Sequence, residues 1–238
     1  MGLEDDDLLA TPEPPQDMRE VAAFLNRFTQ TLENITLTIA NGEDAMALLS
    51  MLDTFTALRK FIVNVYTGTH SPNNLGEFLL RHSPSLRGCF VSLSTFSDTE
   101  TQWEWMDWFH DPDFLPHVKD LQIAGTTSAV RPTLPLAPWL TRHGSTLERF
   151  LFQDFANIWE NMREIFEIIA EQRDPKRPAF VDLNLGLESI SPRDIIDIIR
   201  LFPALHELNI SCQILQNDSG GFGLVRYVYP VNKNSIPI

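Results

Sequence analysis

A six-residue pattern, apolar-x-x-apolar-x-apolar, recurs seven times along this chain of 238 residues. The copies read LENITL, LRKFIV, LRGCFV, VKDLQI, LERFLF, FVDLNL and LHELNI, and they begin at Leu32, Leu58, Leu86, Val118, Leu147, Phe180 and Leu205. Successive copies start 25 to 33 residues apart. One such hexamer carries little weight, because alternating apolar residues are common in proteins. Seven copies in near register across most of the chain indicate an internal repeat.

Each repeat predicts one short β-strand followed by one helix. The hexamers alternate with the period of two that is typical of a strand, and the segments between them carry apolar residues with a period near 3.6. Helix starts are also marked. Ser191-Pro192 followed by Asp194 is one of them, since serine caps a helix and proline fits its first position.

The repeat length decides how the units must pack. A strand and a helix in roughly 29 residues cannot bury an apolar face alone, so neighbouring units stack on one another. The predicted fold class is therefore α/β: a leucine-rich-repeat-like solenoid arc, with a parallel sheet on the concave face and helices on the convex face. A doubly wound nucleotide-binding sheet is the competing topology. It needs helices on both faces and a glycine-rich first turn, and neither the even repetition nor the glycines support it.

Two repeats carry a resemblance to a known family, namely FLLRHSPSLRGCFV at residues 78–91 and WLTRHGSTLERFLF at residues 139–152. They resemble the irregular leucine-rich repeats that follow the F-box in many fungal F-box proteins, and the resemblance covers about residues 18–210. It implies that the chain is the substrate-recognition repeat region of an F-box-type ubiquitin-ligase receptor.

The chain departs from that family in two ways. Regular repeats place Asn or Cys three residues after the last strand leucine. Here those positions hold Ala40, Tyr66, Ser94, Thr126, Phe155, Glu188 and Gln213, so the polar ladder is absent. In addition, residues 1–17 are too few to form an F-box in front of the repeats. We therefore expect no binding of a ligase adaptor by this chain.

The repeats divide the chain into three parts. Residues 1–16 are acidic and contain three prolines, which predicts a flexible tail. Residues 17–211 form the leucine-rich-repeat-like domain of about seven units. Residues 212–238 show no helical pattern, and we expect them to be poorly ordered or to add one irregular strand around Tyr227.

A solenoid also needs a cover at each end of its core. At the front, the first strand can be covered by a helix whose apolar residues are Val21, Phe24, Leu25 and Phe28. At the back, no amphipathic helix follows the last hexamer. We therefore expect Leu208 and Ile210 to lie beside exposed apolar surface and a free sheet edge.

The charge of the chain excludes several classes of partner. Its formal net charge is −14, from 32 acidic and 18 basic side chains, which argues against general nucleic-acid binding and against docking on anionic lipid. No apolar run reaches the ~18 residues of a membrane helix. Two cysteines and a start without a secretory pattern favour the cytoplasm or nucleus.

The sequence offers no catalytic constellation. It has no G-x-S-x-G, and Cys89 takes a core-facing position in the third hexamer, where it acts as a small apolar residue. His110 and His117 lie near Asp111 and Asp113, but prolines interrupt the helix that would orient them as metal ligands. We expect no cofactor and no metal. An enzyme with an unrecognised site, or a truncated repeat protein without a binding role, remains the alternative.

The most informative surface is the one that the repeat defines. Side chains alternate along a strand, so the residues between the core positions of each hexamer form the concave face. We predict that this face binds another protein, whose identity the sequence does not give, and that the chain is a non-enzymatic scaffold. The predicted binding residues are Lys60, Ile62, Phe90, Gln122, Arg149, Leu151, Asp182 and Asn184.

An alternative partner site lies in the aromatic cluster of residues 103–109. Trp105 and Trp108 are spaced to share one face of a helix, and tryptophan is enriched at binding hot spots. Packing of these tryptophans onto the sheet and the neighbouring helices is the competing interpretation.

Overall fold

The last four residues of each hexamer lie in a strand in the computed structural model of the chain. The structure describes residues 15–67, 73–94, 107–125, 133–153, 159–172, 180–215 and 225–230. The strands are β1 (Asn34–Asn41), β2 (Lys60–Thr67), β3 (Gly88–Leu93), β4 (Asp120–Gly125), β5 (Arg149–Gln153), β6 (Asp182–Ile190), β7 (Glu207–Leu215) and β8 (Val225–Pro230). The helices are α1 (Gln16–Leu25), η1 (Asn26–Phe28), α2 (Gly42–Met51), α3 (Asn73–His82), α4 (Thr133–His143), η3 (Gly144–Thr146), α5 (Trp159–Gln172) and α6 (Pro192–Leu201).

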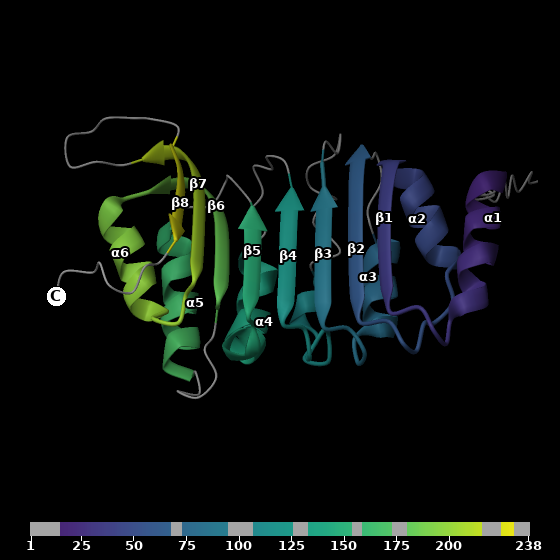
Figure 1. The fold of residues 1–238 in the computed structure, drawn as a ribbon, viewed down its shortest axis with the longest axis horizontal. Coiled ribbons are helices and arrows are strands. Elements are labelled where there is room, and N and C mark those ends of the chain that lie inside the picture. The colour runs from purple at the N-terminus through teal and green to yellow at the C-terminus, as the bar shows by residue number, and fades with distance from the viewer. Residues whose placement is uncertain are drawn as a thin grey trace, which may run out of the picture.

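The strands form one sheet in the order in which they occur along the chain, from β1 to β8. The first seven strands are parallel, and β8 pairs with β7 in the antiparallel direction. Every connection between parallel strands carries a helix or a helical turn, which between β3 and β4 is a 3₁₀ turn over residues 107–110. The α/β class and the parallel sheet of seven strands are thereby confirmed. The helices lie on one side of that sheet (Figure 1).

The core fills the layer between the sheet and the helices. The first, fourth and sixth positions of the hexamer point into it, and in the second to seventh copies all of these side chains are buried, as in Leu58, Phe61 and Val63. In the first copy only the fourth position, Ile35, is fully buried, because β1 has no neighbour on its outer side. These buried positions show that the predicted strand register is correct. Burying one such side chain contributes about 1.5–3 kcal/mol to the stability of the fold.

A ladder of backbone hydrogen bonds joins the units where the strands begin. The carbonyl of Glu33 accepts hydrogen bonds from the N–H groups of Arg59 (2.7 Å) and Lys60 (3.0 Å). The same pair of bonds recurs at each following unit, with the carbonyls of Arg59, Arg87, Lys119, Glu148 and Val181 as acceptors. This ladder satisfies backbone groups between the units although the usual asparagine ladder is missing.

Helices α3 and α4 each end in an Arg-His pair. The arginine of each pair donates hydrogen bonds to backbone carbonyls of the preceding unit. The Arg81 guanidinium donates to the carbonyls of Leu52 (2.9 Å) and Leu49 (3.2 Å) at the end of α2. Arg142 donates in the same way to the carbonyls of residues 109–111. The adjacent His82 accepts from the N–H of Phe55. The RH motif that carries the family resemblance thus has a structural role here.

The front end of the sheet differs from the prediction. Helix α1 packs against α2 and buries Ala22, while Val21, Phe24 and Phe28 are 38%, 57% and 40% exposed. The predicted covering face is therefore wrong for these three residues. Leu25 does pack against the core. The reason is the phase of the helix: Ala22 and Leu25 lie three residues apart on the inner face, and the bulkier residues fall outside it.

The back end of the sheet also differs. Leu208 and Ile210 are each 1% exposed, and β8 pairs with β7 at both residues, so the expected free sheet edge is wrong. β7 continues past the predicted boundary at residue 211 as far as Leu215, and β8 forms on its outer edge. The acidic lead lies outside the described residues, apart from residues 15 and 16. Among the described helices, none is long and apolar enough to cross a bilayer.

Candidate functional site

One face of the sheet carries no described helix, and we call it the open face. The parallel register aligns its outward side chains in rows that cross the strands. The charged row, at the strand starts, contains Asn34, Lys60, Gly88, Asp120, Arg149, Asp182 and Glu207. The central row contains Thr36, Ile62, Phe90, Gln122, Leu151, Asn184 and Asn209. A third row holds mostly small residues, among them Ser92, Ala124 and Gly186.

The central row supplies the apolar surface of the open face. Ile62 and Phe90 stand side by side in register on β2 and β3, and Leu151 follows two strands further on, with Gln122 between. Strand spacing puts Phe90 and Leu151 about 10 Å apart. All three apolar side chains are half-buried, so each presents part of its surface to solvent. Together they form an apolar strip that spans four units, from β2 to β5, with Gln122 as its one polar member.

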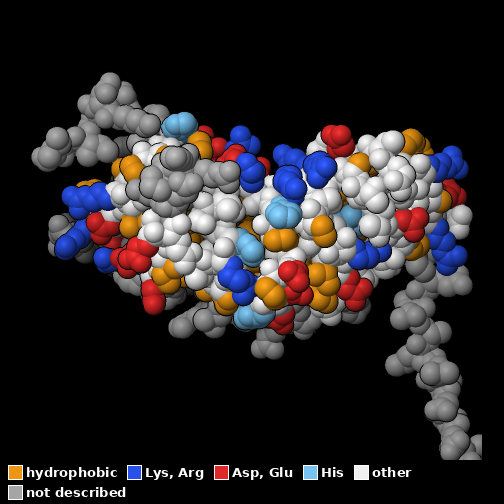
Figure 2. Space-filling view, turned by 90° about the horizontal axis from the view of Figure 1, so that it is seen from below, with side chains coloured by type: hydrophobic (Ala, Val, Ile, Leu, Met, Phe, Trp, Pro, Cys, Tyr) orange, Lys and Arg blue, Asp and Glu red, His pale blue; other side chains and the backbone are white. Residues whose placement is uncertain are grey.

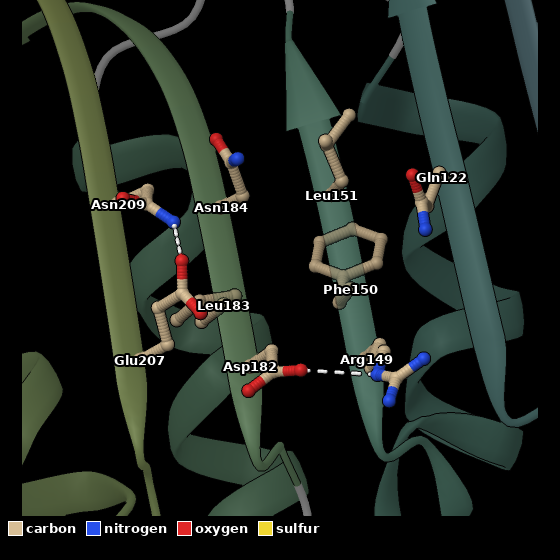
Figure 3. A pocket seen from close by; sticks show the side chains of 9 residues that line it. All are labelled: Gln122, Arg149, Phe150, Leu151, Asp182, Leu183, Asn184, Glu207 and Asn209. Atoms are coloured by element: carbon tan, nitrogen blue, oxygen red, sulfur yellow. Dashed lines mark hydrogen bonds and ion pairs between the residues drawn. The ribbon is translucent and has the colours of Figure 1, made fainter. Parts of the chain in front are cut away.

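A hollow of about 200 Å³ lies over β4 to β7 at one end of this strip. Nine residues line it: Gln122, Arg149, Phe150, Leu151, Asp182, Leu183, Asn184, Glu207 and Asn209 (Figure 3). Phe150 and Leu183 belong to the core and are each 1% exposed, so they contribute only the floor. The walls are side chains of the charged and central rows, all of them polar except Leu151.

Polar contacts hold these walls in place. The Arg149 guanidinium reaches Asp182 on one side, with Nε and Oδ2 3.0 Å apart, and Asp120 on the other, with Nη1 and Oδ2 3.7 Å apart. Gln122 donates to the carboxylate of Asp120 at 2.8 Å, and Asn209 donates to that of Glu207 at 2.6 Å. Ion pairs this exposed contribute about 0–1 kcal/mol each. Their main effect is to orient the polar groups.

Five of the eight predicted binding residues line the hollow, namely Gln122, Arg149, Leu151, Asp182 and Asn184. Lys60, Ile62 and Phe90 lie on β2 and β3 of the same face, outside it. Glu207 and Asn209 belong to the hollow but were not among the predicted residues. The signal for them was present, because they occupy the outward positions of the last hexamer.

The alternative tryptophan site is described only in part. Trp105 lies outside the described residues, and Trp108 sits in a 3₁₀ turn before β4. Trp108 is half-buried and packs against the core. Its indole crosses Gly76 of α3 so closely that a Cβ at that position would lie 2.0 Å from Cδ1. For Trp108, packing is the main observed role.

Both cysteines of the chain are buried in the core. Burial raises the pKa of the Cys89 thiol to about 12, so it stays protonated at neutral pH, and its place in the core is as predicted. Among the described residues, no three His, Cys, Asp or Glu side chains gather closely enough to hold a metal ion.

A scan against protein-family models and searches of curated proteins and of solved structures returned no match.

Proposed function

We propose that this chain is a non-enzymatic scaffold that binds another protein on its open face. In this proposal the units form a leucine-rich-repeat-like solenoid arc, and the open face is its concave side. The arc presents the sheet as one continuous surface to a partner. Binding energy would come from contacts with side chains, because the backbone groups of the inner strands already bond to their neighbours.

The observation that carries the proposal is the apolar strip of Ile62, Phe90 and Leu151 in the central row. The charged row borders it on one side and the row of small residues on the other. An apolar centre with a polar rim is the usual anatomy of a protein-binding surface. Phe90 would be the anchor, since aromatic side chains contribute most at such centres.

The family resemblance gives this proposal a narrower form. In an F-box-type receptor the repeats select the protein that a ubiquitin ligase then modifies. The proposed partner is then a protein target of such a ligase, held by the open face. We propose no contact between these repeats and a ligase adaptor.

Affinity capture with matched variants tests the proposal. The purified chain would be immobilised and exposed to a lysate of the cells that express it, and the captured proteins identified by mass spectrometry. A double variant, Phe90→Glu with Leu151→Glu, places charge in the apolar strip. The control is Ile196→Glu, because Ile196 is an apolar residue of α6, 49% exposed and away from the open face.

We expect proteins captured by the unchanged chain to be retained by Ile196→Glu and lost by the double variant. Circular dichroism and thermal unfolding would show whether each variant keeps its fold. Capture that survives in a folded double variant would place the binding site outside the open face.

A further inference from the structure

The charges along the start of the sheet change sign from one end to the other. This edge consists of two sets of residues. One set is the charged row, and the other, which we call the rim, contains the residue just before each strand. Over β1 to β3 it carries three cations and one anion: Arg59, Lys60, Arg87 and Glu33. Over β4 and β5 it carries two of each: Lys119, Arg149, Asp120 and Glu148. Over β6 and β7 it carries two anions, Asp182 and Glu207, and no Lys or Arg, and its other two residues are Val181 and His206.

The basic end is available for an external anion. Arg59 donates to the carbonyl of Ser85, and Arg87 to those of Pro84 and Leu86. Among the described residues, no carboxylate lies within ion-pair distance of Arg59, Lys60 or Arg87. The stem of Lys60 passes over Gly88, where a Cβ would lie 3.3 Å from Cγ, so the glycine leaves room for this cation to lean toward β3. Figure 2, seen from this edge, shows Lys and Arg side chains gathered near the middle of the molecule.

The middle of the edge neutralises itself. Lys119 and Glu148 form an ion pair on the rim, with Nζ and Oε1 2.6 Å apart. Arg149 lies between Asp120 and Asp182 in the charged row. These charges are directed at one another across the strands, which leaves little net field over β4 and β5.

The acidic end keeps carboxylate surface exposed. The Asp182 side chain is 36% exposed even though Arg149 pairs with it, and Glu207 is also exposed. The amides of Asn184 and Asn209 stand beside them in the central row, on the wall of the hollow (Figure 3). Carboxylates with neighbouring amide oxygens can accept several hydrogen bonds from one lysine or arginine side chain.

We propose that the partner of the open face is a protein segment with separated charges, which crosses the strands in one direction. Its acidic side chains lie over β2 and β3, its apolar centre lies on Ile62, Phe90 and Leu151, and its basic side chains enter the hollow at β6 and β7. This inference rests on the proposed function. It adds the chemistry and the direction of the partner, which the apolar strip alone does not define.

The dimensions suit an extended segment. The centres of the two charged regions, β2–β3 and β6–β7, are four strand spacings apart in the sheet order, or about 19 Å at roughly 4.8 Å per spacing. An extended chain covers about 3.3 Å per residue, so the centres of the two charged blocks would be about six residues apart. A nucleic acid carries the same charge along its whole length, so any gain at β2 and β3 would be offset by repulsion at β6 and β7.

Complementary charges of this kind act mainly on the direction and the rate of binding. Exposed charge pairs contribute little affinity each, but they disfavour arrangements that place like charges together. Reversal of a segregated partner would place its acids over Asp182 and Glu207 and its bases over Arg59 and Arg87. The polarity of the sheet edge therefore selects one of two opposite directions.

Two synthetic peptides of identical composition test the proposal. The segregated peptide has a glutamate block, a Leu-Phe-Leu centre and a lysine block. The mixed peptide keeps the centre and alternates glutamate with lysine on both sides. Binding of each fluorescent peptide to the full chain would be followed by anisotropy at low and moderate salt. We expect the segregated peptide to bind about tenfold more tightly at low salt and to lose most of that advantage as salt rises.

Zero-length carbodiimide cross-linking then determines in which direction the bound peptide crosses the strands, because it joins an amine to a carboxylate in direct contact. We expect Lys60 to couple to the glutamate block, and Asp182 or Glu207 to couple to the lysine block. Lys60→Arg should abolish the first cross-link while leaving affinity unchanged. Lys60→Glu with Arg87→Glu should remove the preference for the segregated peptide, whereas Arg193→Glu on α6 should not.

Equal binding of the two peptides, no binding of the segregated peptide, or cross-links in the opposite direction would overturn the inference. So would tighter binding of single-stranded DNA of similar length than of the segregated peptide. These results leave the proposed function standing as long as lysate capture depends on Phe90 and Leu151. Capture that does not depend on those residues rejects the proposed function itself.

Discussion

Leu183 and Asn184 are neighbours in β6 whose side chains meet opposite environments. Leu183 is 1% exposed in the core, whereas Asn184 stands half-buried in the central row of the open face. The same contrast holds between Leu121 and Gln122 in β4. The alternation of a strand puts them on opposite faces, so substitutions one residue apart should have very different energetic effects.

Replacing Leu183 with Ala should lower the free energy of unfolding by about 2–5 kcal/mol, because it removes buried methyl groups and leaves a cavity. Replacing Asn184 with Ala should change it by about 0.5 kcal/mol or less, because this side chain has no core contact to lose. Urea unfolding of the two variants measures the difference. Similar losses at both positions would mean that the strand register is wrong.

His82 is a buried histidine held in one protonation state. Its Nδ1 donates to the carbonyl of Phe78 at 2.7 Å, and its Nε2 accepts from the N–H of Phe55 at 2.9 Å, an arrangement that only the neutral ring can make. Burial lowers the pKa of His82, and the charge of Arg81 adds to this, while the bond to Phe78 acts in the opposite direction. A proton on Nε2 would remove the bond to Phe55.

Acidification should therefore destabilise the chain through His82. Its pKa is lower in the folded state than in the unfolded state, so the unfolded state takes up the proton first. Stability from this residue is complete above the unfolded pKa, about 6.5, and falls as the pH drops toward the folded pKa. Urea unfolding at about pH 7.5 and about pH 5.5 should show a larger loss for the unchanged chain than for His82→Gln, which does not titrate. An equal loss in both would assign the pH dependence to other groups.

Helix α3 contains a glycine that is required by a neighbouring turn. Gly76 is buried under the indole of Trp108, and a Cβ there would lie 2.0 Å from Cδ1 and 2.1 Å from Nε1. Trp108 comes from the 3₁₀ turn between β3 and β4, the one parallel connection for which the described residues contain no α-helix. The missing side chain lets this turn pack closely on α3.

Replacing Gly76 with Ala should destabilise the chain, by about 1–3 kcal/mol, because the indole must move out of its place. In an unobstructed helix interior the same change stabilises by about 1 kcal/mol. A double-mutant cycle with Trp108→Ala separates the two effects. In the Trp108→Ala background, Gly76→Ala should become neutral or stabilising. A stabilising effect in the presence of Trp108 would show that the indole is not fixed over α3.

At the level of helices and strands, the sequence was sufficient to predict the features that follow from the repeated hexamer. The apolar residues recur at the same positions of every hexamer, so the strands, their order, their buried positions and five residues of the hollow followed from spacing alone. The helix start at Ser191-Pro192 followed from local chemistry and is confirmed, and in the structure Asp194 completes a capping box with Ser191. The ends and the turn at Trp108 could not be predicted in this way. There the packing depends on single contacts, such as Trp108 on Gly76 or Ala22 on the core, which no period encodes.

For the molecule as a whole, contacts pass from each unit to the next. Each strand pairs only with its neighbours, and adjacent helices such as α2 with α3 and α5 with α6 contact one another. Aromatic side chains bridge the units within the core, as Phe150, Phe166, Phe180 and Phe202 do beneath β5 to β7. Because each strand pairs only with its neighbours, stability depends on the contacts between successive units, and the outermost strand covers the backbone edge of the strand beside it.

β8 is the outermost strand of the sheet and covers the edge of β7. It pairs along β7 from Glu207↔Pro230 to Cys212↔Val225, and so occupies the backbone groups that β7 would otherwise leave open. A chain shortened to end at Leu215 should lose stability and should associate, because a free edge of β7 can pair with another copy. Light scattering over a range of concentrations should show a mass above that of the monomer.

A second shortened chain separates edge pairing from general loss of structure. Ser211 faces the open side of β7 and is not part of the core. Ser211→Lys in the shortened chain would add charge along the free edge, which opposes pairing between copies without disturbing buried residues. The shortened chain with this change should return to the monomer while its unfolding midpoint stays low. If the first shortened chain is monomeric and unfolds at the midpoint of the full chain, β8 does not protect the sheet edge.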